Sequence, residues 1–228
     1  MQPMTQGKDD RSSWSGPWNC GARRGYHHGR LKEALIAAAR DLVARHGPAG
    51  FTLSEAAKLA GVTPAAPYRH FPDRDALMVE VAKIGFEQFR AQLNRAWDEG
   101  RPEPSTAFAR MGKAYLDFAR QETGFYFAMF SHAQRISGGG EEASREAFDA
   151  LAHAAGEVLK YRNVSSQGAR ILANEVWAVS HGTATLMLGR YFNPGDPDCD
   201  PSRILESAVT ALVEQAVWRA QQGSGPQL

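Results

Sequence analysis

The 228-residue sequence is poor in cysteine and has no long apolar segment. Its two cysteines, Cys20 and Cys199, lie in loop-like surroundings, so a disulfide framework is not expected and a reducing cytoplasm fits. No run of about 18 uncharged apolar residues is present, which argues against a membrane-spanning helix. The N-terminus also lacks the apolar core of a signal peptide. These absences predict a cytoplasmic protein with no membrane partner.

Motifs of the common enzyme classes are also absent. The sequence has no Gly-x-Ser-x-Gly elbow, no His-Glu-x-x-His pair and no glycine-rich loop followed by Lys that could hold a phosphate. The glycines at 138–140 precede two Glu residues, whose charge is wrong for phosphate. The acidic stretch around Cys199 lacks the spacing of a calcium loop and is interpreted as a turn. The sequence predicts no catalytic residue, no metal ligand and no cofactor; an all-helical enzyme stays an alternative.

The apolar–polar alternation of strands is missing as well, whereas helical spacing recurs along the chain. We predict an all-α protein of about nine helices. The first four begin at Leu31 and after the capping residues Thr52, Thr63 and Asp73. The other five cover approximately 105–121, 124–134, 143–161, 167–191 and 202–221. Residues 1–25 are expected to form a disordered arm, 26–75 a small head, 76–222 a larger body, and 223–228 a disordered tail.

The clearest local pattern lies in the predicted head. Thr52 and Glu55 have the spacing of a capping box, with an apolar residue before them in the staple position. Gly61 can form the tight turn that follows this short helix. Thr63 and Pro64 then have the form of a new helix start. Pro67 cannot donate to the Thr63 carbonyl, so either the first turn of this third helix should be tightened or the helix should start nearer Ala66.

This pattern predicts a helix-turn-helix unit whose third helix is displayed for DNA. Net charge favours the same interpretation, because residues 1–75 carry 11 Lys and Arg against 7 Asp and Glu, while residues 76–228 carry 15 against 18. Chance explains so modest an imbalance equally well. A plain helical hairpin without a partner is the alternative for the motif itself. The predicted DNA-binding residues are Thr52, Thr63, Pro64, Ala65, Tyr68, Arg69, His70 and Arg74.

Residues 30–77 resemble the DNA-binding head of TetR-family transcriptional repressors. The resemblance rests on the long first helix, on FTLSEAAKLAGVT, on YRHF and on PDRDAL, in this order. Arg74 stands where the family usually has Lys, and Pro67 replaces the more usual Leu or Val. In the body, Trp177, His181 and Gly182 resemble the Trp-His-Gly signature of one type of TetR C-terminal domain. The resemblance implies a homodimer that binds a palindromic operator in double-stranded DNA.

The resemblance also implies an effector site beside the aromatic segment at 124–130. Trp177 and His181 are four residues apart and share one helix face. They either line an apolar pocket with a few polar groups or form a core Trp with a hydrogen-bonded His. The predicted ligand-binding residues are Phe89, Phe118, Phe125, Met129, Trp177 and His181.

The last two predicted helices are apolar on more than one face, which indicates burial on more than one side. Two such helices from each subunit would form an intermolecular four-helix bundle. The predicted interface residues are Leu186, Leu205, Val209, Leu212 and Ala216. We therefore expect a homodimeric repressor released from its operator by a small, mainly apolar effector. An activator, or a DNA-binding protein without an effector, is the alternative.

Overall fold

The computed structural model describes residues 30–131, 141–193 and 195–223, and these residues form helices and turns without a strand. The all-α prediction is confirmed. The predicted arm at 1–25 and residues 224–228 of the predicted tail lie outside the described residues. Eight α-helices occur in the described ranges: α1 (Leu31–His46), α2 (Leu53–Leu59), α3 (Arg74–Trp97), α4 (Pro104–Gln121), α5 (Thr123–Met129), α7 (Glu141–Tyr161), α8 (Ala169–Leu188) and α9 (Pro201–Gly223).

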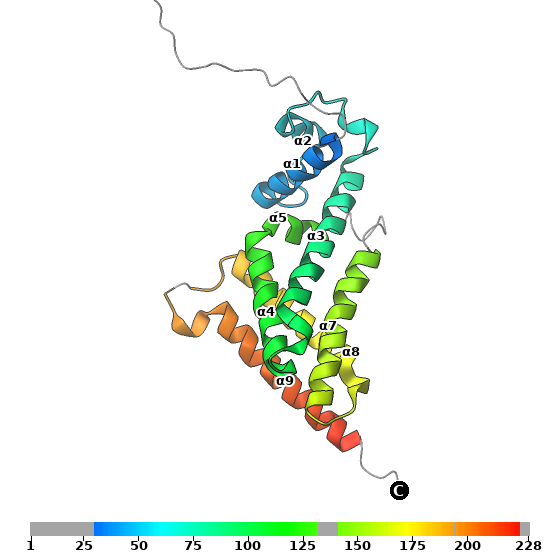
Figure 1. The fold of residues 1–228 in the computed structure, drawn as a ribbon. Coiled ribbons are helices and arrows are strands. Elements are labelled where there is room, and N and C mark those ends of the chain that lie inside the picture. Colours follow the sequence, from blue (N-terminus) through cyan, green and yellow to red (C-terminus); the bar gives the residue numbers. More distant parts are fainter. Residues whose placement is uncertain (1–29, 132–140, 194, 224–228) are drawn as a thin grey trace, which may run out of the picture.

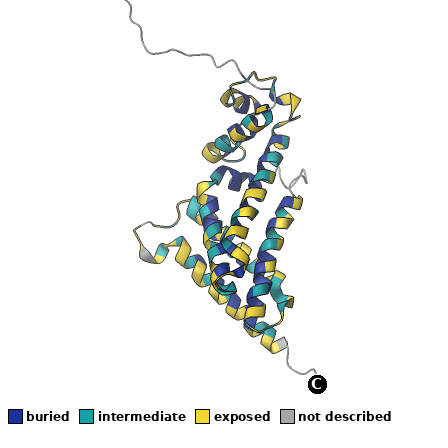
Figure 2. Cartoon of the chain, in the orientation of Figure 1, coloured by how far each residue is buried: buried dark blue, intermediate teal, exposed yellow. Residues whose placement is uncertain are grey.

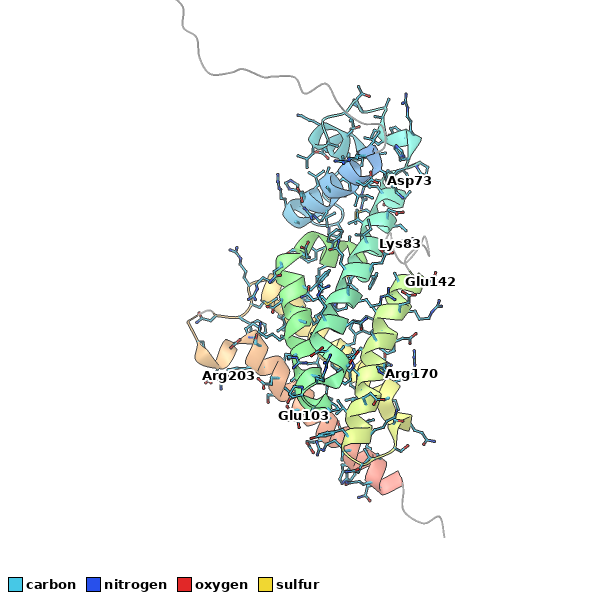
Figure 3. The ribbon with its side chains drawn as sticks, in the orientation of Figure 1. Asp73, Lys83, Glu103, Glu142, Arg170 and Arg203 are labelled. Carbon is cyan, nitrogen blue, oxygen red and sulfur yellow. The ribbon has the colours of Figure 1, made fainter. Side chains whose placement is uncertain are left out.

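The molecule consists of a small head and a larger helical body (Figure 1). The head contains α1, α2 and the start of α3, and α3 then continues into the body, where it packs against α4, α5 and α7. Figure 3 shows this course, with Asp73 at the head and Lys83 further along the same helix. At about 1.5 Å per residue, the 24 residues of α3 span roughly 36 Å. One rigid helix therefore connects the two parts.

The apolar side chains of the head are buried at one end of the single hydrophobic cluster of the described residues, and α1, the α1–α2 connection, the segment before α3 and α3 itself contribute to it. Leu35, Val43, Phe51, Phe71 and Leu77 are all buried there. Such a compact core holds the short α2 in place, since a helix of seven residues is not stable by itself.

Both ends of α2 are capped. The Thr52 hydroxyl accepts a hydrogen bond from the Glu55 amide at 3.2 Å, and the Glu55 carboxylate accepts from the Thr52 amide at 2.7 Å. The predicted capping box is thus confirmed. At the other end Gly61 has a left-handed backbone conformation, with φ at +73°, and the Val62 amide donates to the Ala57 carbonyl at 3.0 Å. The chain therefore turns sharply where the sequence predicts a turn.

The predicted third helix differs from the expectation. Instead of an α-helix, residues 63–66 form a turn that leads into a 3₁₀-helix, η2 (Pro67–Arg69). The Ala66 amide donates to the Thr63 carbonyl at 3.0 Å, whereas Pro67 has no N–H for the α-type bond to the same carbonyl. The tighter 3₁₀ geometry thus replaces the α-helix throughout this segment, whereas the prediction limited it to the first turn or started the helix nearer Ala66. Because this third predicted helix is not an α-helix, the described residues contain eight α-helices instead of the nine predicted.

The body helices each bury one face, which Figure 2 shows as dark blue inner surfaces. α4 packs between α3, α7, α8 and α9, and α5 lies against both α1 and α3. α7 begins at Glu141, so Glu141 and Glu142 are helical rather than part of the predicted loop. α5 ends at Met129, short of the predicted 134, although 132–134 lie outside the described residues. Gly223, predicted in the tail, is the last residue of α9.

Candidate DNA-binding surface and effector cavity

The segment after the α2 turn displays a continuous polar surface. Thr63, Pro64, Ala65, Arg69 and His70 are all exposed. The Tyr68 side chain is 60% exposed, which places it outside the head core. All six are predicted DNA-binding residues.

Two apolar residues fix the orientation of this surface. Pro67 and Phe71 are buried, and the Phe71 amide donates to the Pro67 carbonyl at 2.9 Å. With these two side chains packed inward, the intervening Tyr68, Arg69 and His70 point away from the head core. The displayed segment is therefore held on a rigid scaffold.

Arg74 and Thr52, the two other predicted DNA contacts, are engaged within the head. The Arg74 guanidinium donates to the Pro48 carbonyl, and its Cζ lies 5.4 Å from the centre of the Phe51 ring. Its nearest carboxylate is that of Asp75, at 3.5 Å. These contacts link the start of α3 to the α1–α2 connection. The geometry thus gives Arg74 a structural role within the head, and its contact with phosphate stays a prediction.

The body encloses a small aromatic cavity with a volume of about 50 Å³. Its walls come mainly from α3, α4, α7 and α8. Of the predicted ligand residues, Phe89 and Trp177 line it. Trp177 is 39% exposed, so it is a partly exposed wall residue rather than a core residue. Three residues of its wall carry a hydroxyl group: Tyr115, Ser144 and Ser180.

Three predicted ligand residues pack elsewhere. Phe118 is buried with its ring 5.1 Å from that of Phe89, behind the cavity wall. The Cζ atom of Arg40 in α1 lies 5.5 Å from the centre of the Phe125 ring. Met129 lies against Gly85 of α3. The aromatic segment therefore contacts the head and α3 more than the cavity.

A polar cluster in the body joins three helices next to the cavity. The Tyr126 hydroxyl of α5 lies 2.9 Å from Nδ1 of His181 in α8, and the Tyr115 hydroxyl of α4 lies 3.3 Å from the same nitrogen. The Tyr126 ring also stacks on the imidazole, with centroids 5.6 Å apart. His181 is therefore a hydrogen-bonded histidine of the interior, half-buried among aromatic rings.

Burial sets the ionisation of this cluster. It lowers the pKa of the His181 imidazole below its ordinary value of 6.5 and raises the pKa of the Tyr115 hydroxyl well above 10.0. A neutral imidazole with an unprotonated Nδ1 can accept a hydrogen bond from either tyrosine. The cluster is thus uncharged at neutral pH.

Acid should therefore destabilise the body through His181. The unfolded chain takes up the proton near pH 6.5, while the folded chain takes it up only at lower pH, so this stability is complete above pH 6.5 and is lost as pH falls below it. We expect the drop in melting temperature between about pH 7.5 and pH 5.5 to be smaller in His181→Gln than in the wild type. The exposed His70→Gln is the control and should keep the wild-type drop. An equal drop in melting temperature in both variants would show that protonation of His181 does not destabilise the body.

The predicted interface residues divide into two groups. Leu205, Val209 and Ala216 are buried against their own chain, so the prediction that they face a partner subunit is wrong. Leu212 is half-buried and Leu186 is 45% exposed. On a helix with two apolar faces, sequence spacing does not show which face meets the protein's own core.

The other apolar face of these helices is exposed. α8 and α9 pack against each other, and together they present a stripe of small and apolar side chains to solvent. We call this the α8–α9 face; its most exposed large residues are Ile171, Leu186 and Trp218, with Trp218 at 60%. Exposed small residues between them are Ala178, Gly182 and Ala211.

The sequence prediction missed several residues of the body site. Tyr115 and Tyr126 hold His181, and Phe108, Met111 and Phe130 line the cavity. The spacing of Phe108, Met111 and Tyr115 along α4 places them on one buried face. That spacing is the signal that could have identified this cavity wall.

The described part of the chain offers neither a membrane-spanning helix nor a metal site. None of its helices is both long and apolar enough to cross a membrane. Within the same residues, no group of three or more His, Cys, Asp and Glu side chains is arranged to hold a metal ion.

Two sequence profiles match the chain. The profile of the bacterial regulatory proteins of the tetR family matches residues 35–81, which cover most of the head and the start of α3. The profile of the tetracyclin repressor-like C-terminal domain matches residues 108–212, which cover most of the body.

Individual relatives agree with these profiles. The nucleoid occlusion factor SlmA of Vibrio cholerae serotype O1 is 29% identical over 104 residues, 46% of this chain and 53% of SlmA, so the match spans about half of that protein. A solved structure of a protein of unknown function from Rhodococcus sp. RHA1 is 30% identical, covers 86% of this chain and 98% of its own, and has a TM-score of 0.68.

A second solved structure is that of the transcriptional regulator FadR from Bacillus subtilis in complex with stearoyl-CoA. It is 15% identical, covers 79% of this chain and 97% of its own, and has a TM-score of 0.64, which shows a shared fold. The profiles match the head and the body in the order in which a helix-turn-helix head and a helical body occur in the structure. The chain therefore belongs to the TetR family of transcriptional regulators.

Proposed function

We propose that the protein is a homodimeric repressor in the cytoplasm that binds a palindromic operator and leaves it when a small effector binds the body. The observation that carries DNA binding is the displayed surface after the α2 turn, where six exposed polar or small residues between Thr63 and His70 project from a packed head. Small residues at 64–66 allow the backbone to approach a groove, and Tyr68, Arg69 and His70 offer hydrogen-bond donors to bases and phosphates.

The α8–α9 face supports a dimer. A monomer rarely exposes several large apolar side chains on one pair of helices, as α8 and α9 do with Ile171, Leu186 and Trp218. A two-fold axis through this face would bring two copies of each helix together in a four-helix bundle. Two heads related by that axis would meet two half-sites of a palindrome.

The position of α5 supports a connection between the body and the head. On one side Gly124 and Phe125 contact Arg40 of α1, in the head. On the other side Tyr126 contacts His181 of α8. A ligand that displaces the cavity wall would move this short helix, and with it α1. Such a ligand must prefer the released state by several kcal/mol to switch the equilibrium.

A second candidate function is a DNA-binding protein without an effector. The similarity to the nucleoid occlusion factor over 104 residues favours it, and so does the small size of the aromatic cavity. A ligand that binds the body and releases DNA would exclude this candidate.

Operator binding can be tested with DNA selected from a randomised pool by the full-length protein. We expect the selected site to be palindromic and its affinity to fall steeply with salt, with a slope of about −0.9 in log K per neutralised phosphate. Tyr68→Ala should weaken binding by about 1–3 kcal/mol if Tyr68 reads a base edge.

The matched control is Tyr161→Ala, which removes another exposed tyrosine, at the end of α7. It should leave DNA affinity unchanged. Selection of no site, or binding that does not respond to salt, would refute the proposed function. If Tyr68→Ala instead lowered the melting temperature of the head, Tyr68 would be structural and not a DNA contact.

A further inference from the structure

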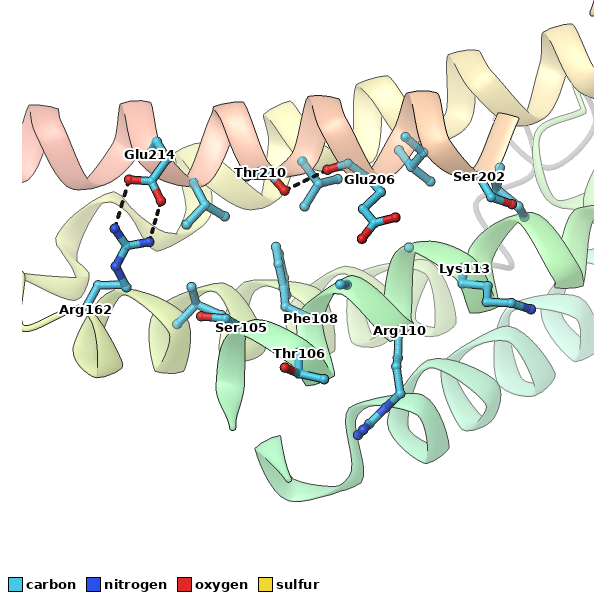
Figure 4. A pocket seen from close by; sticks show the side chains of 17 residues that line it. Ser105, Thr106, Phe108, Arg110, Lys113, Arg162, Ser202, Glu206, Thr210 and Glu214 are labelled. Atoms are coloured by element: carbon cyan, nitrogen blue, oxygen red, sulfur yellow. Dashed lines mark hydrogen bonds and ion pairs between the residues drawn. The ribbon is translucent and has the colours of Figure 1, made fainter. Parts of the chain in front are cut away.

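The aromatic cavity is too small for an ordinary effector. Its volume is about 50 Å³, whereas small-molecule sites usually measure about 300–1,000 Å³. A groove between α4 and α9, shown in Figure 4, has a volume of about 430 Å³. Phe108 and Gly112 of α4 and Val209 of α9 line both the groove and the cavity. The two hollows are therefore neighbours that share one wall.

Gly112 keeps this shared wall thin. It lies inside α4, where glycine is a poor helix former. A Cβ atom built there would be 3.5 Å from Cδ2 of Leu205, an ordinary contact, but a longer side chain would extend further into the passage between α4 and α9. The absence of a side chain thus leaves room in the wall that the groove and the cavity share.

The groove is apolar along its floor and carries charges at its rim. Its three cations already have partners. The Arg162 guanidinium donates to both carboxylate oxygens of Glu214, at 2.6 and 2.8 Å, and Lys113 pairs with Asp117 at 2.7 Å. Arg110 donates to two main-chain carbonyls at the end of α3 and beyond it, at 3.0 and 2.5 Å. None of these cations is an unoccupied site for an anionic ligand.

Glu206 of α9 differs from the cations. Its carboxylate has no ion pair within the described residues, and Figure 4 shows it directed into the space between α4 and α9. The groove therefore presents one unpaired negative charge above an apolar floor. Glu206 lies on a different face of α9 from Trp218, so the groove stays open in the proposed dimer.

We propose that the groove binds a cationic amphiphile, with its head group beside Glu206 and its apolar chain extending past Gly112 towards the aromatic cavity. The part of this proposal that makes the bound molecule an effector rests on the proposed function. The binding itself does not depend on that function. A chain that lies between α4 and α9 would separate α9 from the body core, and α9 also carries half of the α8–α9 face.

The test uses decyltrimethylammonium, decanol and decanoate, each below its micelle concentration, and calorimetry with the full-length protein. We expect the cation to bind most tightly, and to bind about tenfold more tightly than its octyl homologue, as two more buried methylenes predict. Glu206→Gln should remove the preference for the cation over decanol. Gly112→Leu should weaken binding of the cation at least tenfold. Gly112→Ala is the matched control, with affinity within about threefold of the wild type and an equal or higher melting temperature.

Three results would overturn the proposal: no binding of any probe, tighter binding of decanoate than of the cation, or undiminished binding to Gly112→Leu. DNA binding without a probe is measured separately. If the protein selects no operator, the proposed function fails while calorimetry still decides the groove. If the cation binds as expected but does not release the operator, the groove is a binding site and the effector role is wrong.

Discussion

Trp218→Asp is expected to convert the protein to a monomer and to reduce its affinity for a palindromic operator by a factor of about 100 or more. Trp218 is 60% exposed in the single chain, so its removal should not unfold the body. In a dimer that buries the α8–α9 face, an aspartate at this position would place an unpaired charge in an apolar contact. A separated subunit would bind with one head and lose the gain from linked half-sites.

Sedimentation measures the first effect and titration of the selected operator the second. Gln88→Asp, which introduces the same charge at an exposed position of α3, is the control and should change neither. A Trp218→Asp protein that remains dimeric would locate the interface elsewhere. A monomer with full operator affinity would show that the heads do not act as a pair.

Gly124→Ala is expected to lower both the melting temperature and the operator affinity. A Cβ at Gly124 would overlap the carbonyl oxygen of Arg40, and a backbone atom within α1 cannot move away without shifting that helix. Overpacking of this kind costs about 1–3 kcal/mol, which corresponds to about 2–4 °C per kcal/mol in a chain of this size. Because α1 is part of the head, its shift should also alter the spacing of the two heads. We expect operator affinity to fall at least about tenfold.

The control is Gly156→Ala in α7, where the added Cβ would lie 3.5 Å from that of Ala169, an ordinary contact. Its melting temperature should equal or exceed that of the wild type, because alanine favours a helix more than glycine does. Wild-type operator affinity in Gly124→Ala, measured well below its melting temperature, would show that the contact between α5 and α1 is packing only. The proposed route from the body to the head would then be wrong.

Local interactions explain which parts of the head were predictable from sequence. The capping box at Thr52 and the turn at Gly61 depend on side chains and backbone groups within a few residues of each other, and both occur as predicted. The third helix depended on a competition between Pro67, which removes an α-type hydrogen bond, and a sequence context typical of the family. The proline determined the outcome locally, and the segment is a turn followed by a 3₁₀-helix.

Residues of the body were harder to assign, because their roles depend on distant partners. Phe118, Phe125 and Met129 are as aromatic or apolar as the residues that line the cavity, yet they pack against other helices. Tyr126 and His181, 55 positions apart, meet through a hydrogen bond that no local pattern reveals. Arg74 likewise donates to the carbonyl of Pro48, 26 positions earlier, a contact that no local pattern reveals.

The sequence by itself determined the helical class, the capping box and the turn that flank α2 in the head, and the family to which its motifs point. These features depend on periodicity and on short-range hydrogen bonds. Only the tertiary structure decided which apolar face of α9 is buried, where His181 finds its partners, and that a groove adjoins the aromatic cavity. Periodicity places side chains on a face of a helix, but the packing of other helices decides whether that face meets the core, a hollow or solvent.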